Sequence, residues 1–135
     1  MSKTDVTRIW SLNYRLLMSV IASVAPAIAG LGLEVKELFV LSEVEAHPHP
    51  AALATVLCMP KPSVTVYVKR LEAAGFLRRE IDDADLRRHR LTLTSEGRKT
   101  LVRGLALMSR AFGARLARLN SAQQSELATL LEQLS

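Results

Sequence analysis

The segment of residues 53–94 restricts the fold more than any other part of the sequence. Apolar side chains recur at intervals of three and four over residues 51–57 and again over residues 62–74, which predicts two short helices. Only residues 58–61 separate them, so the connection has to be a tight turn. Gly75 follows the second helix, where a residue in the left-handed conformation commonly ends a helix. The pattern predicts a helix-turn-helix.

A two-stranded hairpin is predicted to follow directly. Residues 76–81 have the composition of a strand, residues 82–85 that of a turn, and residues 88–93 alternate between the two faces of a second strand. In this second strand Arg88 and Arg90 share the outer face, and Leu91 and Leu93 share the inner one. A helix-turn-helix that continues into such a hairpin is a winged helix-turn-helix, and the hairpin is its wing.

Helical periodicity also covers residues 5–29, 34–46, 95–119 and 121–134, with Ser121 as the predicted N-cap of the last helix. The terminal helices are so apolar that a second copy of the chain is expected to cover them. Residues 16–33 carry no charge and approach the length of a membrane span, but Pro26, Gly30 and Gly32 interrupt them, so no membrane association is expected.

These elements predict a mainly α fold with a small β-wing, which is a winged helix-turn-helix with N- and C-terminal dimerisation helices. We expect a single domain over residues 1–135. Within it, residues 34–94 form the winged helix-turn-helix lobe, and residues 5–30 and 98–135 form the dimerisation helices.

The basic charge is concentrated in the central segment. Residues 61–103 hold eleven Lys or Arg and six Asp or Glu, a net charge of +5 that equals the net charge of the whole chain. A basic surface on one lobe points to a polyanion as partner, although a solvated basic face explains the charge alone equally well. The single cysteine, Cys58, excludes an intramolecular disulfide and suits the cytoplasm, which is the expected location.

Motifs for catalysis are absent from the sequence, which contains no phosphate-binding loop, no HExxH and no GxSxG. Neither an enzyme nor a cofactor is therefore expected. His47 and His49 lie two residues apart, but this pair alone does not predict a metal site, and a stiff exposed loop is expected instead. Only Lys61 is near enough to activate the Cys58 thiol, so a redox role is a minor alternative.

One face of the helix predicted at residues 62–74 suits a DNA groove. It carries small polar groups, an exposed valine and two cations, which are Ser63, Thr65, Val66, Lys69 and Arg70. In the wing, Arg87, Arg88 and Arg90 are placed to meet the minor groove or the neighbouring phosphates. Double-stranded DNA is the predicted partner. The alternative that stays open is a winged-helix module that docks on an acidic protein and binds no DNA.

Nearly the whole chain resembles the MarR family of bacterial transcriptional regulators. Three stretches carry the resemblance: LATVLCMPKPSVTVYVKRLEAAGFLRR at residues 53–79, DLRRHRLTLTSEG at 85–97 and LGLEVKELFVLSEV at 31–44. The second stretch is the most specific, because it combines an acidic residue, an arginine two positions later and then Leu-x-Leu-Thr-x-x-Gly. The resemblance implies a cytoplasmic homodimer that binds a pseudo-palindromic operator and acts as a repressor released by a small, often aromatic or anionic, ligand.

The resemblance also implies roles for single residues. Ser63, Thr65 and Val66 would meet base edges, and Arg87 would reach the minor groove with Asp85 bracing the wing. The remaining cations of the helix at residues 62–74 and of the turn before it would contact phosphates or the groove; they are Lys61, Lys69 and Arg70.

The sequence departs from the family pattern in three places. Val66 stands where a cation is common, Cys58 stands where glycine is common, and Pro60-Lys61-Pro62 replaces a helix start led by Asp or Ser. Val66 could therefore touch a thymine methyl group. The turn is expected to be stiffer than usual.

A ligand pocket is expected between the first helix and the DNA-binding lobe. Trp10, Tyr14 and Met18 are the candidates to line it, together with Arg15 and His47. Each of these side chains could equally belong to the core or to an interface.

Overall fold

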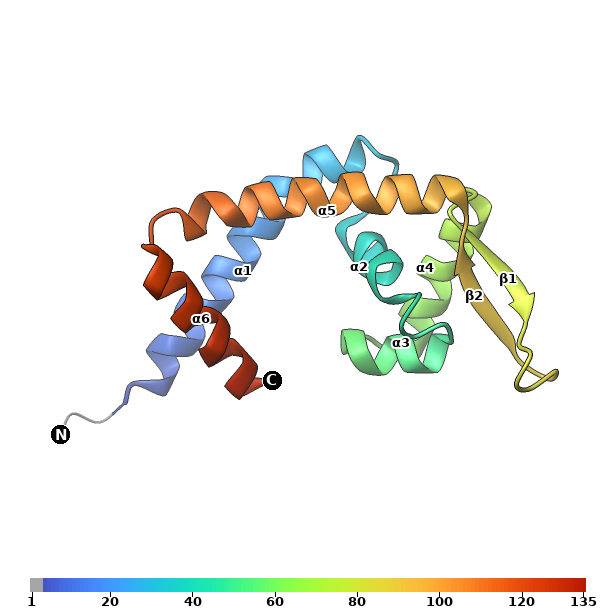
Figure 1. The fold of residues 1–135 in the computed structure, drawn as a ribbon, viewed down its shortest axis with the longest axis horizontal. Helices are drawn as coiled ribbons and strands as arrows, with labels where there is room; N and C mark the ends of the chain where they lie inside the picture. The colour runs from blue at the N-terminus through green and yellow to red at the C-terminus, as the bar shows by residue number, and fades with distance from the viewer. Residues whose placement is uncertain (1–3) are drawn as a thin grey trace. The chain divides into compact units, whose positions relative to one another are not determined.

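The computed structural model describes residues 4–135 and contains six helices and a two-stranded sheet (Figure 1). The elements in chain order are α1 (Val6–Ala29), α2 (Val35–Glu43), α3 (Pro50–Leu57), α4 (Lys61–Ala73), β1 (Leu77–Ile81), β2 (His89–Leu93), α5 (Ser95–Leu116) and α6 (Ser121–Leu134). The predicted class, a mainly α fold with a β-wing, is confirmed. The described residues form two compact units: residues 4–24 with 108–135, and Ala25–Leu107. Their boundaries fall within α1 and α5.

The core of the unit Ala25–Leu107 lies among α2, α3 and α4. Leu38, Leu41, Leu53, Val68 and Leu71 are fully buried there. Burying one such side chain contributes about 1.5–3 kcal/mol to folding. Val56 of α3 lies outside this core, because 41% of it is exposed. With only eight residues, α3 completes about two turns and can bury only a narrow stripe.

The turn between α3 and α4 is held by a residue in the left-handed conformation. Cys58 has φ 53° and ψ 42°, and its N–H donates to the Thr55 carbonyl at 3.3 Å. The Met59 N–H donates to the Ala54 carbonyl at 3.0 Å. This geometry ends α3 abruptly and explains why glycine suits position 58, since a side chain there costs about 1–2 kcal/mol.

The wing, defined as β1, β2 and the connecting residues 82–88, is an antiparallel hairpin in which Leu77 pairs with Leu93 and Ile81 with His89. Leu77 and Leu91 are buried. The Leu91 N–H also donates to the Pro48 carbonyl at 2.8 Å, so the loop before α3 lies along the other edge of β2. The wing extends away from the start of α5 (Figure 1).

The start of α5 is fixed by contacts that explain the Leu-x-Leu-Thr-x-x-Gly pattern. The Thr94 hydroxyl donates to the Gly75 carbonyl and accepts from the Gly97 N–H at 3.0 Å, so Thr94 is the cap. A Cβ on Gly97 would lie 2.0 Å from the Phe76 carbonyl oxygen. Position 97 therefore has to lack a side chain.

The buried residues of α5 are Gly97, Thr100 and Gly104, whereas 43% of Leu105 is exposed. A Cβ on Gly104 would lie 2.4 Å from Cδ1 of Leu38, so α5 approaches α2 closely through its small residues. The larger apolar side chains of α5 are half-buried or exposed.

In the other unit, Asn120 and not Ser121 is the N-cap of α6. The Asn120 side chain accepts from the Gln123 N–H at 2.8 Å, and the Gln123 side chain accepts from the Asn120 N–H at 2.9 Å. The Gln124 side chain donates to the carbonyls of Leu116 and Leu119. These bonds satisfy the C-terminal end of α5, which stops at Leu116 and not at the predicted residue 119.

Large apolar side chains are exposed on α1 and α6. The exposed fraction is 62% for Trp10 and 46% for Leu131, and none of the described residues of α6 is buried. By length and composition α1 is apolar enough to cross a membrane, and only 17% of its most apolar window is buried. A helix covered by a partner protein has the same composition.

Candidate nucleic-acid interface

The exposed face of α4 carries the residues that were predicted to approach DNA. Because α4 buries Val64, Val68 and Leu71, its opposite face is left for solvent or a partner. Val66 and Lys69 are exposed on that face, while Ser63 and Thr65 are half-buried. The Thr65 hydroxyl donates to the Lys61 carbonyl at 3.1 Å, and its oxygen can still accept a hydrogen bond.

Arg70 is engaged within the chain. Its Nη1 lies 3.3 Å from Oε1 of Glu34, and its guanidinium lies 5.9 Å from the centre of the Tyr67 ring. Both members of the ion pair are more than half exposed, so the pair is weak and can exchange for another anion. Of the α4 cations, Lys69 requires no such exchange to bind a phosphate.

The wing tip is arranged so that it presents Arg87. The Asp85 carboxylate accepts from the Arg87 N–H at 3.0 Å and lies 3.4 Å from its Nε. The Arg88 N–H donates to the Asp85 carbonyl at 2.9 Å. The side chain of Arg87 is 92% exposed. Asp85 therefore holds the loop, and Arg87 projects from it.

Asp82 stabilises the same loop from its first position. Its Oδ1 accepts from the Ala84 N–H at 2.8 Å, and the Asp82 N–H donates to the Arg88 carbonyl at 3.0 Å. The pKa of Asp82 lies below the usual value for an aspartate, mainly because the Ala84 N–H donates to its carboxylate. Partial burial raises this pKa. The Asp85 N–H and the charges of His49 and Arg88 lower it further. Its carboxyl group is therefore ionised near neutral pH.

Arg88 and Arg90 lie in different surroundings. Arg88 is exposed at the edge of a recess, here called the wing recess, which is lined by His49, Pro50, Ala51, Ala52, Lys61, Arg79, Arg88 and His89. Arg90 is half-buried, and within residues 4–135 its buried Nε has no hydrogen-bond partner. Lys61, Arg79 and Arg88 make the wing recess cationic.

Two residues of the wing recess, His49 and Arg79, did not emerge from the sequence as site residues. The contact of the loop before α3 with β2 brings His49 to the wing, although 40 positions separate it from His89. The only sequence signal was the placement of His49 between two prolines, which indicated a stiff loop.

The aromatic ligand candidates lie on the exposed surface of α1. The rings of Trp10 and Tyr14 are 6.2 Å apart between centres, and Met18 is also exposed. They are not among the residues that line the recess of their own unit, which are Leu16, Phe112, Arg115, Leu116, Arg118, Leu119 and Leu127. Arg15 is exposed as well, and His47 in the other unit lies 3.9 Å from Glu43. Their ligand roles stay predictions.

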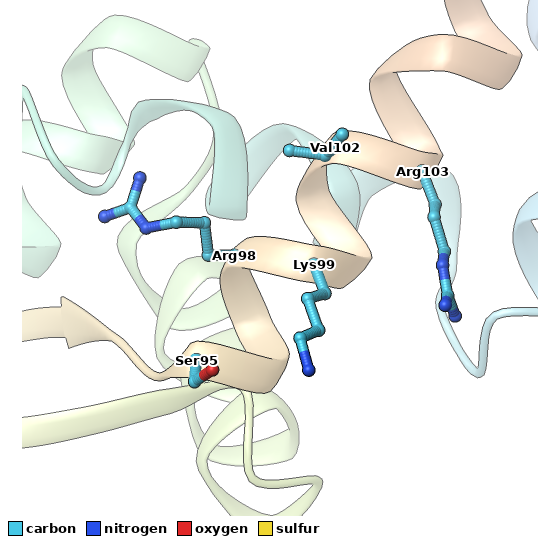
Figure 2. Close-up of a pocket in the computed structure, with 5 residues that line it drawn as sticks. All are labelled: Ser95, Arg98, Lys99, Val102 and Arg103. Atoms are coloured by element: carbon cyan, nitrogen blue, oxygen red, sulfur yellow. The ribbon is translucent and has the colours of Figure 1, made fainter.

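A second basic recess lies on the first turns of α5, where Lys99 and Arg103 project from one side of the helix and Arg98 from another (Figure 2). Ser95 and Val102 complete it. Arg98 lies 2.9 Å from Glu45, and Lys99 lies 3.6 Å from Glu96. These partners neutralise part of its charge, as Glu72 does for Arg79 of the wing recess at 2.9 Å.

Known proteins share both the sequence pattern and the fold. The sequence model of the MarR family matches residues 31–88. A MarR family protein of Mycobacterium tuberculosis, solved with p-aminosalicylic acid, is 30% identical; the match covers 92% of this chain and 95% of that one, with a TM-score of 0.75. No curated protein matches the sequence.

The same Mycobacterium tuberculosis protein, solved with DNA, matches at 27% identity over 98% of this chain and 99% of that one, with a TM-score of 0.77. A transcriptional regulator of the MarR family from Silicibacter pomeroyi is 25% identical over 91% of this chain and 85% of that one, with a TM-score of 0.75. On the strength of the family model across the winged helix-turn-helix and of a 30% identical relative along almost its full length, this chain belongs to the MarR family.

Proposed function

We propose that this chain is a cytoplasmic, dimeric transcriptional regulator that binds a pseudo-palindromic DNA site. One observation carries the proposal: the wing tip is braced by Asp85 so that Arg87 is almost fully exposed on the same lobe as the exposed face of α4. A basic wing beside an exposed helix face fits the grooves and phosphates of DNA. The structure of a 27% identical relative with DNA supports this assignment.

In the proposed complex, α4 enters the major groove. Ser63, Thr65 and Val66 face base edges, and Lys61 and Lys69 contact phosphates, whereas Arg70 must first release Glu34. At the wing, Arg87 enters the minor groove and Arg88 contacts the backbone. Arg90 has a supporting role, because it is half-buried.

The proposed dimer uses α1 and α6. Their exposed apolar residues, among them Trp10, Leu12 and Leu131, require a cover that one chain does not supply. A pseudo-palindrome follows from a two-fold axis, because each lobe then reads one half-site.

We further propose that the protein is a repressor released by a small aromatic acid. The Mycobacterium tuberculosis relative has been solved with p-aminosalicylic acid and with salicylic acid, in structures that match this chain at 30% and 28% identity. Trp10, Tyr14 and Met18 remain the proposed contacts, and the dimer would complete their surroundings. No catalytic role is proposed.

Selection of bound sequences from a random duplex pool tests the function directly. We expect a two-fold symmetric consensus sequence. The affinity should fall as the salt concentration rises, and each phosphate contact should add about 0.9 to the steepness of log affinity against log salt concentration. When the selection is repeated with salicylate, the amount of bound duplex should fall if this class of ligand releases the DNA. If no duplex is retained even at low salt, DNA binding is rejected, and the protein-interaction alternative gains support.

A further inference from the structure

His49 joins the start of α3 to the wing through both nitrogens of its ring. It is the N-cap residue of α3. Its Nδ1 lies 3.2 Å from the His89 carbonyl oxygen in β2, and its Nε2 lies 3.1 Å from Oδ2 of Asp82 at the end of β1. The side chains of His49 and Asp82 are only 21% and 13% exposed, so water competes little for these contacts.

Both partners of the His49 ring are hydrogen-bond acceptors. A backbone carbonyl cannot donate, and the Asp82 carboxylate is ionised near neutral pH because its pKa is lowered. A neutral imidazole carries one N–H and can satisfy only one of the two oxygens. In that state the other ring nitrogen directs a lone pair at an oxygen. Only the protonated ring donates to both partners at once.

Charged groups of both signs surround His49. Asp82 lies against its ring, and the cations of the wing recess are Lys61 of α4, Arg79 of β1 and Arg88 of the wing loop. Arg79 is paired with Glu72 of α4 at 2.9 Å. The ring of His89 lines the same recess, and only its backbone oxygen bonds to His49.

The contact reaches the loop that presents Arg87. Pro48 and Pro50 stiffen the chain on either side of His49, and the Pro48 carbonyl already accepts from β2. Asp82 then closes the wing loop through its N–H, which donates to the Arg88 carbonyl. Arg88 directly follows Arg87, so Asp82 is linked to the position of Arg87 through the backbone of the wing loop.

We propose that His49 is a positioning residue for the wing: its protonated ring ties the wing to the start of α3 and so strengthens DNA binding as the pH falls. Histidine is the side chain that ordinarily changes charge between about pH 5 and 8, and the tests below cover this interval. This inference extends the proposed function. Its statement about DNA binding rests on that function, and its statement about the contact between His49 and the wing does not.

The first test needs no DNA. NMR of the ¹⁵N-labelled full chain between pH 8 and 5.5 follows the ring nitrogens of His49 and the amide exchange of the wing. We expect protection of the wing amides to rise as the His49 ring gains its second proton, with both ring protons visible. His49→Gln and, as a second variant, Asp82→Asn should remove that rise. A wing whose protection is independent of His49 protonation overturns the proposal.

The second test compares affinity for the selected DNA at pH 8 and pH 6. We expect the unmodified protein to gain about three- to tenfold more affinity than His49→Gln over this interval, the size of one ordinary intramolecular hydrogen bond. His47→Gln and His89→Gln are matched controls, because each removes one imidazole and leaves both His49 contacts in place. They should keep the gain.

The outcomes separate the two proposals. If all three variants gain the same affinity for DNA between pH 8 and pH 6, the gain reflects only a general attraction of added positive charge to DNA. That result would overturn the role of His49. Absence of DNA binding at every pH would reject the proposed function, and the NMR titration would still decide whether the wing is tied through His49.

Discussion

At the scale of single residues, function depends on a few side chains whose neighbours hold them in place. Arg87 is exposed because Asp85 binds its backbone N–H and lies beside its Nε. In the proposed complex, such bracing would reduce the entropy that the arginine loses on entering a groove. The stabilising contacts come from within the wing loop, and the Arg87 side chain remains 92% exposed beside Asp85.

Replacing Arg87 with alanine is expected to weaken DNA binding by roughly 1–3 kcal/mol, because a well-formed groove contact is lost. Fluorescence anisotropy with the selected operator measures the change. Arg103→Ala removes the same charge from α5 and should have a much smaller effect. Equal losses in the two variants would mean that net charge, and not the position of Arg87, determines affinity.

Gly97 is a second residue whose identity is set by a contact. A Cβ there would lie 2.0 Å from the Phe76 carbonyl oxygen, which belongs to the backbone and cannot move alone. Gly97→Ala should therefore destabilise the fold by about 1–3 kcal/mol, as overpacking does. Urea unfolding followed by circular dichroism measures this loss.

Gly113→Ala is the matched control in the same helix. A Cβ at position 113 has no other described atom within 4 Å, so the substitution should gain about 0.5–1 kcal/mol from helix propensity. If both substitutions stabilise the protein, the close approach of α5 to Phe76 is not rigid.

At the scale of elements, the stability of the wing is expected to depend on pH through Asp82. The folded state lowers the pKa of Asp82, chiefly through the Ala84 N–H. A lowered pKa means that the ionised form stabilises the fold at pH values above the aspartate's unfolded pKa, and that this contribution is lost as the pH falls through the lower, folded pKa.

Acidification below about pH 4 should thus loosen the wing loop. We expect the Ala84 amide resonance to shift with a midpoint below the usual value for an aspartate. The transition should vanish in Asp82→Asn, in which the amide oxygen can still accept but does not titrate. A midpoint at or above the usual aspartate value would contradict the assigned hydrogen bond as the main cause.

At the scale of the whole molecule, the exposed apolar surface of α1 and α6 is the basis for the proposed dimer. Leu130, Leu131 and Leu134 lie along one side of α6 and are all exposed. A soluble monomer rarely leaves such a stripe uncovered. The proposed homodimer buries it and presents two wings to one DNA site.

Leu131→Glu should dissociate the dimer, because each chain loses about 1.5–3 kcal/mol of apolar burial and gains a charge at the contact. Analytical ultracentrifugation at micromolar concentration follows the change. Thr129→Glu adds the same charge on the opposite side of α6 and should remain dimeric. An unmodified chain that sediments as a monomer would reject the dimer and with it the two half-sites.

Local patterns were enough to predict the elements and their order. The apolar periodicity of α2, α3 and α4, the glycine after α4 and the acidic turn of the wing predicted a winged helix-turn-helix, and the structure confirms it. These features depend on residues a few positions apart, for which spacing and backbone preference are sufficient. The contact between Asp85 and Arg87 is of the same local kind, and the DNA-binding roles of the two residues stay predictions.

Contacts between distant residues could not be obtained in this way. Periodicity predicted the helix α5 and assigned residues 98–135 to dimerisation, but it did not indicate that Gly97 and Gly104 face inward, where the backbone of α5 approaches Phe76 and Leu38 closely. His49 became part of the wing only through the docking of its loop on β2. Sequence spacing reports which residues share a face of one element, whereas only the packed chain decides which element that face meets.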